Sequence, residues 1–111
     1  MSDPQQVLSR LADVIDRRYR ERPDGSYTTL LFNSGLANMV GKFAEEAAEL
    51  VEAAAAVPQR GERVRHEAAD LLFHLLVVLR ACQVSLDDVW AELARREGQS
   101  GLAERKSRDR S

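Results

Sequence analysis

The chain has 111 residues, of which 44% are apolar and 5% aromatic, enough for one compact domain with a modest core and too little for two. It has no apolar run of 18 or more residues, no secretory signal at its start, and a single cysteine, Cys82, so we expect a cytoplasmic protein that has no disulfide and does not span a membrane. Sixteen basic and eighteen acidic residues give a net charge of −2, which argues against a nucleic-acid polymer as a partner.

The N-terminal third of the sequence predicts two helices joined by a turn. Apolar residues recur at helical spacing over about residues 4–22, which predicts an amphipathic helix. Pro-Asp-Gly at residues 23–25 predicts a turn. Ser26 is placed to cap a short helix over residues 27–32, and Asn-Ser-Gly at residues 33–35 is expected to end it.

Two long helices are predicted to follow, over about residues 36–57 and 62–83. Pro58 and Gly61 lie between them and are expected to break the chain. Because the loop between the two segments is short, the helices are expected to pack as antiparallel neighbours.

The C-terminal part is predicted to hold one more helix and a tail. Ser85 and Asp88 have the spacing of a capping pair for a helix that ends near Arg96, and residues 99–111 form a polar, basic tail. The fold class is therefore all-α, a single domain over residues 1–111 with two long antiparallel helices and shorter ones. These helices enclose little core in one chain, so we expect a homodimer to complete the bundle.

The first long helix combines a broad apolar face with four glutamates. Glu45, Glu49 and Glu52 lie opposite the apolar face on a helical wheel, and Glu46 lies at its border. The apolar face consists of Leu36, Met39, Val40, Phe43, Ala47, Leu50, Val51 and Ala54. Taken alone, this pattern is most often a solvated acidic face.

The second long helix is apolar nearly all round, which is typical of a buried helix. Glu67, Asp70 and His74 nevertheless share one stripe at positions i, i+3 and i+7. A carboxylate beside so much apolar surface is costly unless it is protonated, paired with a base or bound to a cation. We also expect His74 to be a buried, hydrogen-bonded histidine, with contact to the carboxylates as the alternative, and Cys82 and Trp90 to lie in the core.

The two long helices carry acidic pairs of the same spacing. Glu46 and Glu49 are three residues apart, as are Glu67 and Asp70, so facing helices would bring four carboxylates together. Oxygen ligands favour Mg²⁺ or Mn²⁺ over zinc, and neither His66 nor His74 has a ligand-spaced partner. The alternative is an acidic patch paired with arginines of neighbouring helices.

A Mg²⁺ cluster of this kind is typical of enzymes that act on phosphates. The sequence has no glycine-rich phosphate loop, so a nucleotide substrate would be held through the metal, with help from Lys42 and from basic residues of the tail.

Two segments carry a resemblance to known enzymes. KFAEEAAE at residues 42–49 and EAADLLFHLL at residues 67–76, with seventeen residues between the last glutamate of the first and the first of the second, resemble the EExxE…ExxD signature of the all-α, MazG-type nucleoside triphosphate pyrophosphohydrolases. SYT at residues 26–28, DVWAEL at 88–93 and SGLAE at 100–104 are similar to the phosphoribosyl-ATP pyrophosphohydrolase family of histidine biosynthesis. The resemblance runs over about residues 7–108.

The resemblance implies Mg²⁺-dependent hydrolysis of phosphoribosyl-ATP to phosphoribosyl-AMP and pyrophosphate by an all-α dimer, with Mn²⁺ as a possible substitute. It implies four metal ligands: Glu46, Glu49, Glu67 and Asp70. Glu45 and Glu46 would be catalytic, with Glu45 either a ligand or a group that orients water. The substrate-binding residues would be Lys42, Ser26, Tyr27, Lys106 and Arg108. The chain departs from the family pattern at Asn38, Gly41 and Ala44, where bases or glycine are common.

Some alternatives remain open at this point. Ser26 and Tyr27 could serve only as a helix cap and its packing neighbour, and Lys106 and Arg108 could lie in a solvated tail. The same carboxylates would also suit a house-cleaning hydrolase of dUTP or of damaged nucleoside triphosphates. A non-catalytic helical dimerisation module with an acidic face is the alternative from another functional class.

Overall fold

The computed structural model describes residues 3–56 and 60–98, and these residues form helices without any strand. The all-α prediction is confirmed. The elements in chain order are a 3₁₀ helix, Pro4–Gln6, followed by α1 (Val7–Glu21), α2 (Tyr27–Asn33), α3 (Leu36–Ala55), α4 (Arg60–Ala81) and α5 (Leu86–Arg96).

The predicted serine caps are present. The Ser26 hydroxyl oxygen accepts a hydrogen bond from the Thr29 backbone N–H at 3.2 Å and so begins α2, and the Ser85 oxygen accepts from the Asp88 N–H at 3.1 Å and begins α5. Each cap satisfies one of the N–H groups that the first turn of a helix leaves unpaired. Helix α1 ends at Glu21, and the left-handed backbone of the next residue, Arg22 (φ 48°), turns the chain toward α2.

The ends of the long helices differ from the predicted ones. Helix α3 ends at Ala55, two residues early. Helix α4 begins at Arg60, so Gly61 lies inside its first turn and the prediction that Gly61 breaks the chain is wrong. A glycine weakens a helix most in its interior, and the N–H groups of the first turn have no intrahelical partner to lose. Helix α4 also ends before residue 83, because Gln83 takes a left-handed conformation (φ 62°).

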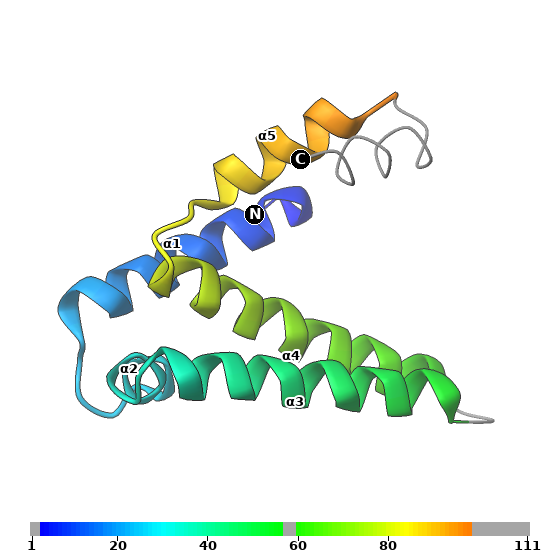
Figure 1. The fold of residues 1–111 in the computed structure, drawn as a ribbon, viewed down its shortest axis with the longest axis horizontal. Coiled ribbons are helices and arrows are strands. Elements are labelled where there is room, and N and C mark those ends of the chain that lie inside the picture. The colour runs from blue at the N-terminus through cyan, green and yellow to red at the C-terminus, as the bar shows by residue number, and fades with distance from the viewer. Residues whose placement is uncertain (1–2, 57–59, 99–111) are drawn as a thin grey trace, which may run out of the picture.

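Helices α3 and α4 run antiparallel and side by side, as predicted, with α1 and α2 packed at one end of the pair (Figure 1). Helix α5 leads away from this pair, at 107° to α4. Among the described residues no single helix is long and apolar enough to cross a membrane, and one bent pair, Gly61–Ala81 with Leu86–Arg96, passes that test by length and composition only.

The buried core lies where α1, α2, the start of α3 and the end of α4 meet. Its buried members are Ile15, Leu31, Phe32, Met39, Leu76 and Val77. The Tyr19 ring packs edge-on against Phe32, with the centroids 4.9 Å apart. The core therefore fixes one end of the α3–α4 pair, and the rest of the pair extends beyond it.

Only part of the predicted apolar surface is buried. On α3, Met39 is buried whereas Leu36, Val40 and Val51 are exposed, Val51 to 69%. Cys82 and Trp90 are exposed as well, so the prediction that they lie in the core is wrong for this chain. Trp90 is exposed because α5 leads away from the core, with Leu86 near its start as the residue that packs there.

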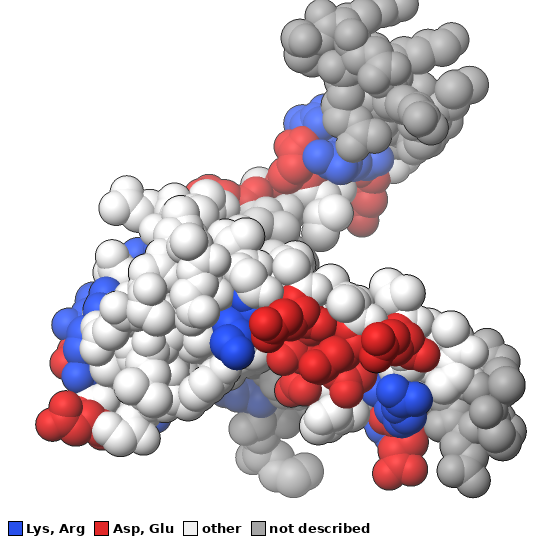
Figure 2. Space-filling view, turned by 60° about the horizontal axis from the view of Figure 1, so that its bottom comes forward, with Lys and Arg blue, Asp and Glu red and all other residues white. Residues whose placement is uncertain are grey.

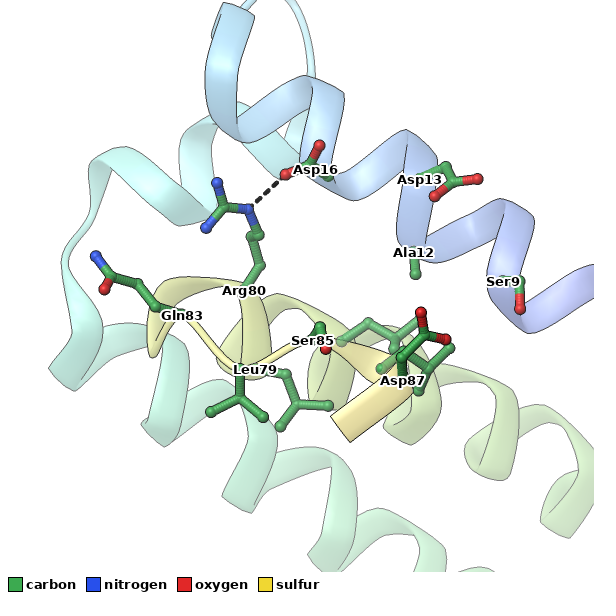
Figure 3. A pocket seen from close by; sticks show the side chains of 12 residues that line it. Ser9, Ala12, Asp13, Asp16, Leu79, Arg80, Gln83, Ser85 and Asp87 are labelled. Atoms are coloured by element: carbon green, nitrogen blue, oxygen red, sulfur yellow. Dashed lines mark hydrogen bonds and ion pairs between the residues drawn. The ribbon is translucent and has the colours of Figure 1, made fainter. Parts of the chain in front are cut away.

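An ion pair joins α1 to α4 beside the core. The Arg80 Nε donates to Asp16 Oδ1 at 2.6 Å (Figure 3), while Arg20 Nε donates to the other oxygen at 3.0 Å. The Arg80 hydrogen bond is the main reason that the Asp16 pKa lies below its ordinary value. The Arg80 guanidinium also stacks 4.1 Å from the centroid of the Tyr19 ring.

A cavity of about 370 Å³ lies next to this ion pair, between α1, the end of α4 and the start of α5 (Figure 3). Its polar lining includes Ser9, Asp13, Asp16, Arg80 and Asp87. None of the glutamates predicted to bind metal lines it.

We expect Asp16→Asn to lower the free energy of unfolding at pH 7 by up to about 1 kcal/mol, because the carboxylate is 40% exposed and solvent weakens such pairs. A lowered pKa stabilises the fold above the ordinary aspartate value of about 3.9 and loses this effect as the pH falls below it. Urea unfolding at pH 7 and pH 3 should therefore show a difference between wild type and variant that shrinks in acid. Asp13→Asn, one turn away and without an ion pair among the described residues, is the control and should match wild type at both pH values.

Candidate metal centre

Three glutamates meet where α3 and α4 face each other. Glu46 and Glu49 lie one turn apart on α3 and Glu67 faces them from α4, and each offers a carboxylate oxygen within 4.8 Å of the other two. We call these three residues the acidic cluster. Figure 2 shows acidic side chains gathered on this face of the helix pair, with basic side chains beside them.

Two oxygens of the acidic cluster are buried without a hydrogen-bond partner. These atoms are Oε2 of Glu46 and Oε2 of Glu67. Among the described residues, no lysine or arginine forms an ion pair with any of the three carboxylates, which removes the main support for an arginine-paired acidic patch. A buried polar atom without a partner is costly, so the arrangement favours a bound cation.

The pKa shifts of the clustered glutamates also favour a bound cation. Burial raises the pKa of Glu46 above its ordinary value, and the nearby Glu49 charge raises it further, while His74 acts weakly in the opposite direction. Burial also raises the pKa of Glu67, with Glu49 again the main neighbour responsible. In the metal-free protein the cluster therefore holds its negative charge at a cost, which a divalent cation would remove.

Asp70 lies beside the acidic cluster and contacts a histidine, His66. His66 Nε2 is 3.3 Å from Asp70 Oδ2, and His66, Glu67 and Asp70 also have ligand atoms within 4.8 Å of one another. Glu67 belongs to both groups, so all four predicted metal ligands share one neighbourhood. The statement that His66 has no ligand-spaced partner is wrong, because residues four apart lie on the same face of a helix, and that spacing to Asp70 was the available signal.

Glu45 and Lys42 lie apart from the three clustered carboxylates. Lys42 Nζ is 3.5 Å from Glu45 Oε2, one turn along α3, and the Glu45 side chain is mostly exposed. Glu45 therefore lies outside the acidic cluster, although it directly precedes Glu46 in the sequence. Lys106 and Arg108 lie outside the described residues.

Ser26, Tyr27 and His74 belong to a separate group of contacts. Ser26 caps α2, as its sequence position predicts. His74 is 6% exposed and its Nδ1 lies 2.9 Å from the Asp70 carbonyl oxygen, which confirms the expectation of a buried, hydrogen-bonded histidine. The exposed Tyr27 lies against it, with its hydroxyl 3.5 Å from His74 Nε2.

The donor set fits magnesium. Glu46, Glu49, Glu67 and Asp70 offer only carboxylate oxygens, which suit hard cations such as Mg²⁺ and Mn²⁺. The buried, unpartnered oxygens of two of them give the cation a physical reason to bind.

Comparison with known proteins places the chain in a family. Residues 8–97 match the family model described as phosphoribosyl-ATP pyrophosphohydrolase. The chain belongs to the phosphoribosyl-ATP pyrophosphohydrolase family. The resemblance seen in the sequence is thereby confirmed, and the family is one of hydrolases.

Individual relatives of this hydrolase family cover nearly the whole chain. A protein from Rhodopirellula baltica, called phosphoribosyl-ATP pyrophosphatase, is 47% identical over 91% of this chain and 85% of its own length. A protein of the same name from Paramagnetospirillum magneticum is 44% identical over 97% of both chains. One from Erythrobacter litoralis is 50% identical over 92% of this chain and 96% of its own.

We expect Glu46→Gln to raise the midpoint of thermal unfolding in the metal-free protein at pH 7, because the amide removes a buried charge. A raised carboxyl pKa destabilises the fold as the pH rises through the ordinary glutamate value, about 4.3, toward the higher value in the folded state. The difference should therefore fade when melting is repeated at pH 4. Glu52→Gln, on an exposed part of α3, is the matched control, and a Glu46→Gln midpoint that equals or falls below wild type at pH 7 would contradict this account.

Proposed function

We propose that this chain is a Mg²⁺-dependent phosphoribosyl-ATP pyrophosphohydrolase, which converts phosphoribosyl-ATP to phosphoribosyl-AMP and pyrophosphate in the second step of histidine biosynthesis. The observation that carries the proposal is the acidic cluster with its buried, unpartnered oxygens, in a chain of this family. Cleavage of an α–β phosphoanhydride needs positive charge near the phosphates, and the cluster is built to hold it.

Glu46, Glu49, Glu67 and Asp70 would hold Mg²⁺, with Mn²⁺ as a substitute. When bound, the cation would neutralise phosphate charge and polarise the bond to be cleaved. Repulsion among the carboxylates is then balanced by the attraction that each of them gains, so metal binding and folding of the α3–α4 pair reinforce each other.

Lys42, Glu45 and Glu46 of α3 are proposed to act on the water and the phosphates. The carboxylate of Glu45 or Glu46 would orient the attacking water and accept its proton, while the oxygen of that water bonds to phosphorus and pyrophosphate leaves. Lys42, already within 3.5 Å of Glu45, would donate hydrogen bonds to a phosphate oxygen, and this would replace part of its contact with Glu45.

Further substrate contacts are proposed at the start of α2 and in the C-terminal tail. The Ser26 oxygen accepts from a backbone N–H, so the hydroxyl still has its own proton to donate to a phosphate oxygen. Tyr27 offers an exposed ring beside the Asp70 turn of α4. Lys106 and Arg108 would add positive charge for the phosphates.

We further propose that the protein works as a homodimer in the cytoplasm. Leu36, Val40 and Val51 fall within about 60° of arc on α3, about 60° or more from the buried Met39 and Ala53, and all three are exposed. We call these three residues the α3 stripe. An apolar surface of this kind favours contact with a second protein surface. The cytoplasmic location rests on the single cysteine and on the proposed biosynthetic role.

The decisive experiment is a substrate panel with and without Mg²⁺. Wild-type protein should release pyrophosphate from phosphoribosyl-ATP with Mg²⁺ and lose this activity in EDTA, and should act far more slowly on dUTP and other dNTPs. Glu46→Gln should lower kcat by about 100-fold or more, as loss of one group that stabilises a transition state does. A preference for dNTPs would instead support a house-cleaning hydrolase.

Glu52→Gln and a metal-only melting curve serve as controls. Glu52→Gln changes the charge of α3 by the same amount outside the cluster and should keep wild-type activity. Millimolar Mg²⁺ should raise the unfolding midpoint of wild type and of Glu52→Gln but not of Glu46→Gln, because a ligand stabilises only the fold that binds it. An unchanged wild-type midpoint would favour a non-catalytic helical module.

We expect Val51→Asp to shift the protein from dimer to monomer in sedimentation-velocity experiments, because a charge within an apolar contact is costly to bury. Glu52→Lys, the neighbouring residue outside the α3 stripe, should leave the mass of the particle unchanged. A wild-type protein that sediments as a monomer would refute the dimer proposal, and a dimeric Val51→Asp would place the contact elsewhere.

A further inference from the structure

His74 is a buried titratable residue to which the proposed metal chemistry gives no task. It lies on α4 one turn after Asp70, is 6% exposed, and has its Nδ1 2.9 Å from the Asp70 carbonyl oxygen. A carbonyl oxygen can only accept a hydrogen bond, so Nδ1 must carry a proton. In the neutral imidazole ring the other nitrogen, Nε2, is then an acceptor.

Nε2 of His74 meets a residue that comes from a distant part of the chain. Tyr27, at the start of α2, has its hydroxyl oxygen 3.5 Å from His74 Nε2, at the long end of hydrogen-bond distances. Ring packing supports this contact, because the Tyr27 ring lies edge-on to His74 and stacked on Phe73, each with centroids 6.3 Å apart. Since Nε2 is an acceptor, the Tyr27 hydroxyl is the donor.

This direction of the hydrogen bond limits what Tyr27 can bind. A phenol can donate one hydrogen bond, and His74 Nε2 already accepts it. Tyr27 is 53% exposed, so the outer side of its hydroxyl oxygen can still accept a hydrogen bond from a ligand. Ionised phosphate oxygens cannot donate one, whereas ribose hydroxyls and the adenine amino group can.

We propose that His74 is a positioning residue that accepts a hydrogen bond from the Tyr27 hydroxyl and so directs Tyr27 to accept a hydrogen bond from a ribose hydroxyl or the adenine amino group of the substrate. The proposal rests on the proposed function, since it assigns one side of the same substrate. In this arrangement the carboxylates of α3 and α4 would bind the phosphates through the cation, and Tyr27 would bind the nucleoside part of the substrate.

The test compares Tyr27→Phe, His74→Asn and the double variant in steady-state hydrolysis of phosphoribosyl-ATP. Loss of one neutral hydrogen bond is worth about 0.5–1.5 kcal/mol, equivalent to about a 2- to 12-fold change. Tyr27→Phe should raise KM by this factor with kcat within about twofold of wild type. Asn at position 74 keeps a donor near Nδ1 but lacks the Nε2 acceptor, so it should raise KM similarly. The double variant should be no worse than either single variant, because both remove one shared interaction.

Three controls separate this role from others. Tyr19→Phe removes the same hydroxyl from a core tyrosine and should keep the wild-type KM. Inhibition by inorganic pyrophosphate, which has no nucleoside, should be equal in wild type and Tyr27→Phe. The rise in unfolding midpoint caused by Mg²⁺ alone should also be equal, which shows that the metal centre is intact in each variant.

Each alternative outcome has a distinct meaning. An unchanged KM in Tyr27→Phe, with active wild type, overturns the role of Tyr27. If Tyr27→Phe weakens inhibition by pyrophosphate by the same factor as it raises KM, the nucleoside assignment is overturned. Additive effects on KM in the double variant overturn the positioning role of His74. A wild type that is inactive on phosphoribosyl-ATP overturns the proposed function, and with it the substrate on which this inference depends.

Discussion

Carboxylates that face each other across two antiparallel helices dominate this structure. Glu46 and Glu49 on α3 meet Glu67 on α4, and within the described part of the chain two of their oxygens are buried without a hydrogen-bond partner. Charges of one sign in such surroundings oppose the packing of the two helices. The helix pair therefore needs either protons or a cation at this point, and the proposed function assigns the cation.

The other helices keep this pair in register. The core formed by α1, α2, the start of α3 and the end of α4 lies at one end of the pair, and the Asp16–Arg80 ion pair joins α1 to α4 beside it. Stability is thus supplied at a distance from the carboxylates, so the packing there does not have to be favourable by itself. The cavity near Asp16 is lined by residues of α1, the end of α4 and the start of α5, and none of the clustered glutamates lines it.

Sequence reasoning predicted the helices and most of the site because both depend on local spacing. The caps at Ser26 and Ser85 and the pairs at i, i+3 are properties of single helices, and the structure contains them. Sequence reasoning failed where contacts between helices determine which side chains are buried. Which half of the α3 apolar face packs on α4, and whether Trp90 reaches the core, depend on where neighbouring helices lie. The contact of Tyr27 with His74 joins residues 47 positions apart, and no local pattern predicts it. His66 is different, since its spacing to Asp70 was visible and its meaning was missed.

Helix α3 presents two main surfaces around its axis: one toward α4 and the core, which holds Met39, Ala53 and the Glu46 carboxylate of the acidic cluster, and the α3 stripe toward solvent. One added or deleted residue in this helix would rotate everything after it by about 100°. Both surfaces would then face the wrong neighbours at once, although every residue type was still present. A single substitution at an exposed position of α3 such as Glu52 leaves this arrangement in place, whereas the number of residues between Met39 and Ala53 is fixed by geometry.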